Sequence, residues 1–339
     1  MMLLCEGNLD VHTAKTATGV LLYCPEEVVA VIDRETAGRT LTDVIDMDRD
    51  VPIVSTVAEG IALGGRQLVI GVANVGGTLL PRFRPHIAEA LKQGIDVVSG
   101  LHQMLDEDEE FIGLAKASGA RMVELRRVPA MPCGTNLARK LPNHRVLTVG
   151  SDCNVGKMCT SLELARQARE RGMDAVFAAT GQTGMLIAGS GYCIDRAICD
   201  FASGVAEKLV LERAEHDYVF IEGQGSLDHP SFSGVTLSLM HGSAPQSMIM
   251  CHASDRRDRR HEDGSVLMPL AELIALHEQM SRPILPGKVV GVSIFTHTLD
   301  EGAARDELAR VSDQTGLPAT DPVRFGAGVL LDAIVEHAR

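Results

Sequence analysis

Aromatic residues are scarce in this chain of 339 residues, which has no Trp, three Tyr and eight Phe. Proteins that bind single-stranded nucleic acid stack bases on aromatic side chains, and this sequence offers few of them. Basic residues are in the minority, since 32 Lys and Arg face 45 Asp and Glu and leave a formal charge of −13. The one dense basic run, 256–260, is interrupted by Asp258, and we interpret it as a solvated loop. These absences argue against nucleic acid as a partner.

The sequence also lacks the patterns of a zinc-binding, secreted or membrane protein. Its eight cysteines include no CxxC pair and no Cys/His group at zinc-ligand spacing, which predicts reduced thiols and no metal site. No run of about 18 apolar residues is present, and the N-terminus has no charged region followed by an apolar stretch. We therefore expect a cytoplasmic protein with no membrane partner.

Apolar runs of strand length alternate with helix-period segments along the whole chain, which is the pattern of parallel sheets flanked by helices. The length favours two domains, and the proline-rich segment 129–143 is the best boundary between them. We predict a Rossmann-like domain at 1–128, a linker at 129–143 and a second parallel-sheet α/β domain at 144–339. The expected strands are Val28–Ile32, Gln67–Ala73, Asp96–Ser99, Arg121–Leu125, Arg145–Val149, Ala175–Ala179, Tyr218–Ile221, Ser247–Cys251 and Val289–Ile294. The expected helices are 84–92, 109–118, 157–171, 195–214, 269–281, 302–315 and 326–338.

The most informative segment follows the expected strand Arg145–Val149. The chain turns through Gly150, reaches Gly156 and Lys157, and then continues as an amphipathic helix. Backbone amides in such a turn and the positive end of the helix favour phosphate oxygens, and the lysine adds a full positive charge. We therefore predict a phosphate-binding loop whose cofactor-binding residues are Ser151, Asp152, Cys153, Asn154, Val155, Gly156, Lys157 and Met158.

Two features of this loop differ from the usual phosphate loop of nucleotide-cleaving enzymes. Five residues rather than four separate Gly150 from Gly156, and Met158 replaces the Ser or Thr whose hydroxyl binds Mg²⁺. Thr160 or Asp152 would have to supply that oxygen instead. The loop therefore favours binding a phosphate-bearing cofactor over hydrolysing one.

Polar, glycine-rich segments follow two of the expected strands, Ala175–Ala179 and Tyr218–Ile221. One is 180–184, with Gln182 and Thr183, and the other is 222–229, with Glu222 and Gln224. In an open parallel sheet ligands gather beyond the carboxyl ends of the strands, so both segments are expected near the phosphate loop. Glu222 is a candidate general base, metal ligand or substrate anchor, with turn capping as the alternative.

Asp228 and His229 are adjacent and form a second candidate acid/base pair, although such a dipeptide is a weak signal on its own. Arg324 lies in the turn before the last helix, and its planar guanidinium can bind a carboxylate or phosphate through two hydrogen bonds. The alternative interpretation is that Arg324 pairs with Asp321. Arg82 and Arg84 follow a glycine turn at 74–77, which is either a second anion subsite or a packed loop.

Several of these motifs together resemble a known P-loop family. They are Gly-Ser-Asp-Cys-Asn-Val-Gly-Lys-Met at 150–158, Ala-Thr-Gly-Gln-Thr-Gly at 179–184, Ile-Glu-Gly-Gln-Gly-Ser-Leu at 221–227, His-Gly-Ser at 241–243 and Gly-Leu-Pro-Ala-Thr-Asp-Pro-Val-Arg-Phe-Gly at 316–326. The combination is similar to the D-glutamate N-acetyltransferase family of the DgcN type, over nearly the whole chain. The loop and Glu222-Gly-Gln-Gly also resemble dethiobiotin synthetase, whose loop has Thr or Ser where this chain has Met158.

The resemblance implies a Rossmann-like N-terminal domain, a P-loop C-terminal domain, and transfer of acetyl from acetyl-CoA to the amine of D-glutamate. With this small-molecule amino-acid substrate, the expected catalytic residues are Glu222, Asp228 and His229. The expected substrate-binding residues are Gln182, Thr183, Gln224, Arg324, Arg82 and Arg84. The alternatives are a ligase or kinase that uses ATP with Mg²⁺ on Glu222 and Asp152, and a non-catalytic nucleotide-binding protein. We also expect a homo-oligomer.

Overall fold

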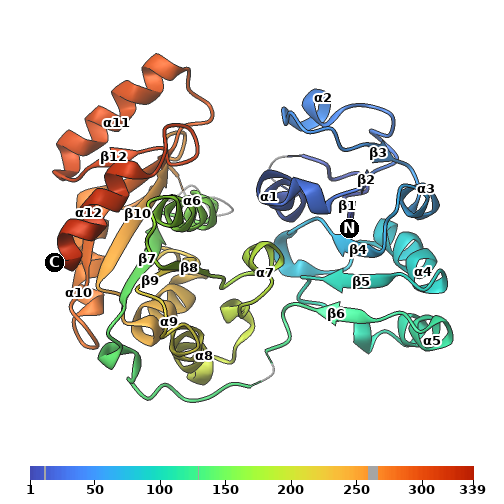
Figure 1. Cartoon of the computed structure of the whole chain (residues 1–339), viewed down its shortest axis with the longest axis horizontal. Helices are drawn as coiled ribbons and strands as arrows, with labels where there is room; N and C mark the ends of the chain where they lie inside the picture. The colour runs from blue at the N-terminus through green and yellow to red at the C-terminus, as the bar shows by residue number, and fades with distance from the viewer. Residues whose placement is uncertain (11–12, 129, 259–265) are drawn as a thin grey trace. The chain divides into compact units, whose positions relative to one another are not determined.

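The chain forms two compact α/β units in a computed structural model, which describes residues 1–10, 13–128, 130–258 and 266–339 (Figure 1). The first unit comprises 1–128 with the short segment 185–189, and the second comprises 129–184 with 190–339. Each unit contains a six-stranded sheet whose strands all pair in parallel. The predicted fold class is therefore confirmed.

The sheet of the first unit has the order β3-β2-β1-β4-β5-β6. This is the strand order of a Rossmann fold. Its strands are β1 (Met2–Leu4), β2 (Ala30–Ile32), β3 (Ile53–Val54), β4 (Gln67–Ile70), β5 (Asp96–Ser99) and β6 (Met122–Glu124). β1 was not among the expected strands, yet it lies in the middle of the sheet with all three of its side chains buried.

Five α-helices flank this sheet among the described residues: α1 (Lys15–Tyr23), α2 (Leu41–Ile45), α3 (Val57–Ala62), α4 (Arg84–Lys92) and α5 (Glu109–Ser118). Local capping explains where several of them begin. The side chains of Thr40, Thr56 and Asp108 accept first-turn amides of α2, α3 and α5. The bounds of α4 and α5 are those predicted from the apolar periodicity.

The sheet of the second unit has the order β12-β11-β10-β7-β9-β8. Its strands are β7 (His144–Gly150), β8 (Ala175–Ala178), β9 (Tyr218–Ile221), β10 (Ser247–Ala253), β11 (Lys288–Phe295) and β12 (Ala319–Thr320). The chain leaves β7 toward β8 and β9 on one side and later returns to β10 on the other, so the topology switches direction at β7. The carboxyl end of β7 is therefore where a ligand is expected in an open α/β sheet.

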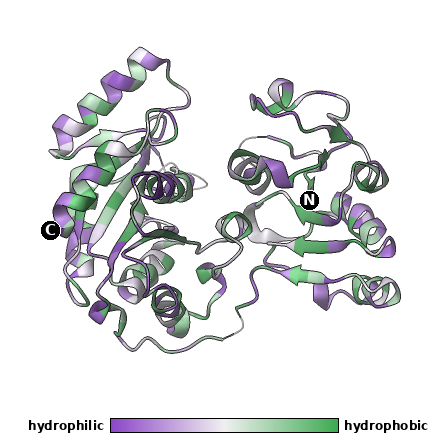
Figure 2. Ribbon diagram, viewed as in Figure 1, coloured by the Kyte–Doolittle hydropathy of each residue, from purple (hydrophilic) through white to green (hydrophobic). Residues whose placement is uncertain are grey.

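The helices of the second unit among the described residues are α6 (Lys157–Glu170), α8 (Cys199–Leu211), α9 (Ser233–Ser243), α10 (Leu270–Ser281), α11 (Glu301–Thr315) and α12 (Gly328–Ala338). α7 (Gln182–Ala188) follows β8 in the chain, and its residues from Met185 onward belong to the first unit. Hydrophobic residues concentrate along the strands of both sheets, and hydrophilic residues on the outward sides of the helices (Figure 2). Among the described residues, no helix combines the length and apolar character needed to cross a bilayer.

Arg145, the second residue of β7, is a fully buried cation that stabilises the second unit. Its Nε donates to the carbonyl oxygens of Ser243 and Ala244 at the end of α9, and its Nη1 donates to the carbonyl and side-chain oxygens of Asn143 at 2.8 Å. Burial lowers the pKa of Arg145 to about 10, so the guanidinium keeps its charge at neutral pH. It satisfies carbonyl groups that a helix end would otherwise leave unpaired.

Replacing Arg145 by Met should lower the free energy of unfolding of the second unit by about 3 kcal/mol, because buried carbonyl oxygens lose their donors. Calorimetric scans should then show a fall in Tm of roughly 6–12 °C for that unit. Arg166→Met on α6 is the matched control, because this guanidinium pairs with Glu163 and Glu170 on the surface. It should cost under about 1 kcal/mol. Equal losses in the two variants would contradict the stabilising role.

Candidate active site around the phosphate loop

The loop between β7 and α6 presents backbone amides at the point where the topology switches. Asn154 and Gly156 have φ values of 57° and 87°, and this left-handed backbone reverses the chain into α6. Gly156 is the N-cap of α6 and has no side chain that could accept the first amides. The positive end of α6 thus has no N-cap side chain over it, which is an arrangement that suits an anionic ligand.

Lys157 brings its charge inside the loop. Its side chain is buried, and Nζ donates to the carbonyl oxygen of Asp152 at 2.7 Å. A Cβ placed on Gly150 would lie 2.9 Å from this Nζ, so the glycine at the end of β7 makes room for the lysine. The loop therefore holds a cation against one of its own carbonyl groups, which is an arrangement that suits a phosphate ligand.

The carboxylate of Asp152 is fully buried beneath the loop. One oxygen accepts the amide of Cys153 at 2.7 Å, and the other pairs with Nη1 of Arg256 at 2.9 Å. The interpretation of the basic run as a solvated loop was wrong for Arg256, whose side chain is only 14% exposed because it neutralises Asp152. Arg259 and Arg260 of that run lie outside the described residues.

Sequence reasoning also missed a partly buried pair that joins the loop to β10. The hydroxyl of Ser151 lies 2.8 Å from Nδ1 of His252 on β10, and the Ser151 amide donates to the Cys251 carbonyl. Burial lowers the pKa of His252 to about 4, so its ring is neutral at physiological pH. Ser151 and His252 are brought together only by the pairing of β7 with β10, and no local sequence pattern predicts that contact.

Glu222 lies where β9 ends, as predicted, and it is buried. Its Oε2 accepts the amides of Thr180 at 2.8 Å and Gly181 at 3.1 Å. Burial raises the pKa of Glu222 to about 7, against the opposing effect of those two amides and of the charge of Lys157. A carboxyl group that titrates near neutrality is suited to take and return protons.

The predicted residues Gln182, Thr183 and Gln224 lie on the segments around Glu222. Gln224 donates from Nε2 to the hydroxyl of Thr180 at 3.1 Å, and that hydroxyl donates to the Glu222 carbonyl at 2.7 Å. Gln182 and Thr183 are the first residues of α7, the former buried and the latter half-buried. The structure thus brings the glycine-rich segments after β8 and β9 together.

His229 is buried, with its ring against that of Phe232 at a centroid distance of 4.5 Å. Its Nδ1 accepts the amide of Ser231 at 3.1 Å, which makes Nε2 the ring's hydrogen-bond donor. The neighbouring Asp228 accepts the amide of Met268. Both line a surface hollow of about 330 Å³, together with Leu227, Pro230 and Ser233.

The predicted arginines make other contacts. The guanidinium of Arg324 donates to the Leu299 carbonyl at 2.8 Å and to the Thr296 carbonyl at 3.2 Å. The Asp321 carboxylate accepts the backbone amide of Arg324 at 3.2 Å and the Thr296 hydroxyl at 2.8 Å. In the first unit, Arg84 forms a two-bond pair with Asp108 at 2.8 Å. Arg82 is exposed. A role for these three in substrate binding stays a prediction.

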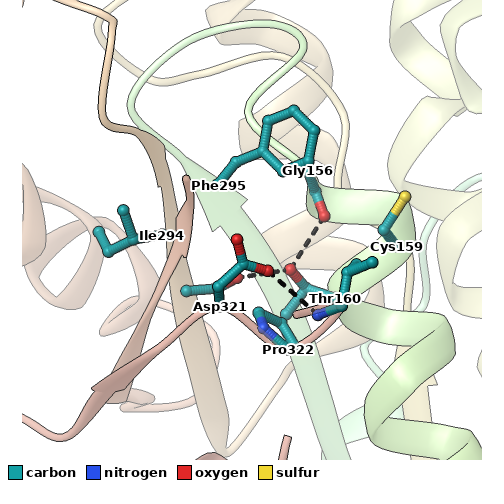
Figure 3. Close-up of a pocket in the computed structure, with 9 residues that line it drawn as sticks. Gly156, Cys159, Thr160, Ile294, Phe295, Asp321 and Pro322 are labelled. Atoms are coloured by element: carbon teal, nitrogen blue, oxygen red, sulfur yellow. Dashed lines mark hydrogen bonds between the residues drawn. The ribbon is translucent and has the colours of Figure 1, made fainter. Parts of the chain in front are cut away.

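The residues that would have to position Mg²⁺ are engaged elsewhere. Met158 offers no oxygen, and the hydroxyl of Thr160 donates to the Gly156 carbonyl at 2.9 Å and lies 2.8 Å from the Ser293 hydroxyl. Figure 3 shows Thr160 beside a cavity between α6 and the end of β11, next to Phe295. At about 10 Å³ this cavity has room for a water molecule but not for a substrate.

Comparisons with known proteins agree with this geometry. A family model described as a domain of unknown function, DUF1611_C, P-loop domain, matches residues 132–331. A second, described as the DUF1611_N Rossmann-like domain, matches residues 34–128. The crystal structure of a DUF1611 family protein from Anabaena variabilis has a TM-score of 0.94 and 37% identity to this chain, covering 99% of this chain and 98% of that one.

Two relatives are named D-glutamate N-acetyltransferase. The protein from a Pseudoalteromonas species is 38% identical over 285 residues, which are 83% of this chain and 84% of that protein. The protein from Tritonibacter scottomollicae is 37% identical over 331 residues, which are 96% of this chain and 95% of that protein.

Replacing Lys157 by Ala should weaken the binding of CoA and of inorganic pyrophosphate by roughly 10- to 100-fold, because a charge-assisted hydrogen bond to phosphate is lost. Titration calorimetry on the whole chain measures both ligands. Lys288→Ala is the control, since this lysine pairs with Glu278 at the beginning of β11. Unchanged affinity of Lys157→Ala for both ligands would refute the assignment of the phosphate loop.

Proposed function

This chain belongs to the DUF1611 family, and from that premise we propose that it is an acyltransferase that moves acetyl from acetyl-CoA to the amine of D-glutamate. The observation that carries the proposal is the site itself. A loop built to hold phosphate, without the hydroxyl that would position Mg²⁺, lies beside a carboxyl group whose pKa is raised to about 7. The names of the two relatives supply the substrate.

Residues 152–157 would hold the phosphate groups of CoA. The amides at the beginning of α6 and the ammonium of Lys157 provide donors and positive charge, and Gly156 keeps the approach open. Such an enzyme does not need the Mg²⁺-binding hydroxyl that Met158 replaces, because the phosphates of CoA are bound but not cleaved. The flexible pantetheine arm would have to fold back to bring its thioester to the carboxyl ends of the strands.

Glu222 would take a proton from the substrate. The ammonium group of an amino acid is not nucleophilic, so it must become a neutral amine before its nitrogen attacks the thioester carbonyl carbon. The carbon–sulfur bond then breaks, and the thiolate that leaves takes up a proton. A base with a pKa near 7 holds the ammonium proton and releases it again without a large penalty.

Negative charge that develops on the carbonyl oxygen needs donors. The amides of Gly181 and Gly223 are already engaged, by Glu222 and by the Thr148 hydroxyl. We assign this role to Nε2–H of His229, which is the ring's donor when Nδ1 accepts the Ser231 amide. A preorganised donor of this kind lowers the barrier by about 3–4 kcal/mol.

The decisive experiment measures free thiol during incubation with acetyl-CoA and D-glutamate, with L-glutamate, D-aspartate and glycine in parallel. Thiol release that depends on D-glutamate, together with N-acetyl-D-glutamate identified by mass spectrometry, supports the proposal. A parallel incubation with ATP, Mg²⁺ and the same acceptors tests the ligase alternative. Formation of ADP without thiol release would overturn acetyl transfer.

Replacing Glu222 by Gln should lower kcat by roughly 100-fold or more, the usual contribution of a general base, while the Kd for CoA changes little. Because the carboxylate is the active form, kcat of the natural protein should fall as the pH drops below about 7. This limb of the pH profile should disappear in the variant. Glu278→Gln, at the ion pair with Lys288, is the control. If kcat of Glu222→Gln equals that of the unsubstituted protein, the Glu222 carboxyl group is not the base.

A further inference from the structure

Cys153 places a thiol at the tip of the phosphate loop, next to two other reactive groups. Its Sγ, one carboxylate oxygen of Asp152 and one ring nitrogen of His229 all lie within 4.8 Å of one another. Asp152 and His229 are buried, whereas Cys153 is half-buried. The three residues come from the segments after β7 and after β9, so only the folded sheet assembles them.

Cysteine, histidine and aspartate are also ligands for transition metals, but here the carboxylate is occupied. One oxygen of Asp152 accepts the Cys153 amide, and the other pairs with Arg256 at 2.9 Å. The ammonium of Lys157 lies 2.7 Å from the carbonyl oxygen of the same aspartate. Two cations at this distance disfavour a third, so the cluster suits an anion or a nucleophile better than a metal.

The surroundings of Cys153 are those of a nucleophilic cysteine. Such residues stand near a helix N-terminus, beside histidine or cationic side chains, and partly accessible. Cys153 precedes α6 by four residues, and the neighbouring His229 lines the hollow of about 330 Å³. In contrast, burial raises the pKa of the Cys251 thiol on β10 to about 11 and keeps it protonated.

Building on the proposed function, we propose that Cys153 carries the acetyl group between donor and acceptor as an S-acetyl thioester. In the first half-reaction the Cys153 sulfur attacks the thioester carbonyl carbon of acetyl-CoA, and the bond to the CoA sulfur breaks. CoA leaves as a thiol, with the proton that Cys153 lost.

In the second half-reaction the neutral amine attacks the new thioester on Cys153. The amide bond forms, the bond from carbon to the Cys153 sulfur breaks, and the amine proton moves through Glu222 back to that sulfur. His229 donates Nε2–H to the carbonyl oxygen in both halves. No oxidant or further reactant is needed, and donor and acceptor occupy the same hollow in turn.

The test begins with acetyl-CoA and the natural protein in the absence of any amine. After an acid quench and digestion, mass spectrometry should find acetyl on the peptide with Cys153, and hydroxylamine should remove it. Addition of D-glutamate before the quench should discharge the label as N-acetyl-D-glutamate, and initial rates should follow a ping-pong pattern. An absence of label in a protein that makes N-acetyl-D-glutamate would overturn the relay and leave the proposed function intact.

Variants of Cys153 distinguish a chemical role of this thiol from a merely structural one. Cys153→Ala and Cys153→Ser should lose the label and slow turnover by roughly 100-fold or more, with Tm unchanged. Cys199→Ala is the matched control, since Cys199 is an exposed cysteine at the first position of α8, and it should keep both label and turnover. Natural turnover in Cys153→Ala, or a stoichiometric metal ion that this variant loses, would refute the relay. Label on Cys153 without N-acetylation of D-glutamate would support the relay and reject D-glutamate as the acceptor.

Discussion

The buried carboxylate of Asp152 is the interaction on which the candidate site depends. It accepts the next amide in the loop and pairs with Arg256, which comes from about a hundred residues further along the chain, while the carbonyl of the same residue accepts Lys157. A buried charge without a partner is very costly, so Arg256 must stay where it neutralises Asp152. The loop after β7 and the segment after β10 are thereby fixed to each other before any ligand arrives.

Glycines then decide how closely the strand ends approach. A Cβ on Gly223 would overlap the carbonyl oxygen of Thr148, so only glycine lets the chain after β9 lie against β7. A Cβ on Gly184 would collide with the carboxylate of Glu222, and one on Gly181 would lie 2.7 Å from Nε2 of Gln224. The glycine-rich segments therefore act by bringing Glu222 within reach of the phosphate loop, while its burial raises the pKa.

Local patterns predicted what local physics determines. The helix periodicity located α4 and α5 to the residue, and the strand before Gly150 together with Gly156 and Lys157 located the phosphate loop. The pattern failed for β1, because three residues at the very beginning of the chain carry no periodicity, although the sheet buries all of them. It also failed for Arg256, since a charged residue in a polar run looks solvated until the sheet places a buried carboxylate opposite it.

The same long-range contacts explain how such a loop would bind phosphate without cleaving it. Each group that would place Mg²⁺ in a nucleotide-cleaving relative is diverted: Met158 has no oxygen, the Thr160 hydroxyl bonds within its own helix turn and to Ser293, and Asp152 is neutralised by Arg256. The groups that can transfer protons or donate hydrogen bonds lie instead after β9. They are Glu222, whose pKa is raised to about 7, and His229, whose Nε2 is the ring's donor. Bound phosphate would then anchor the donor, while the groups after β9 carry out proton transfer and charge stabilisation. That division of labour suits group transfer from a thioester better than transfer of the phosphate itself.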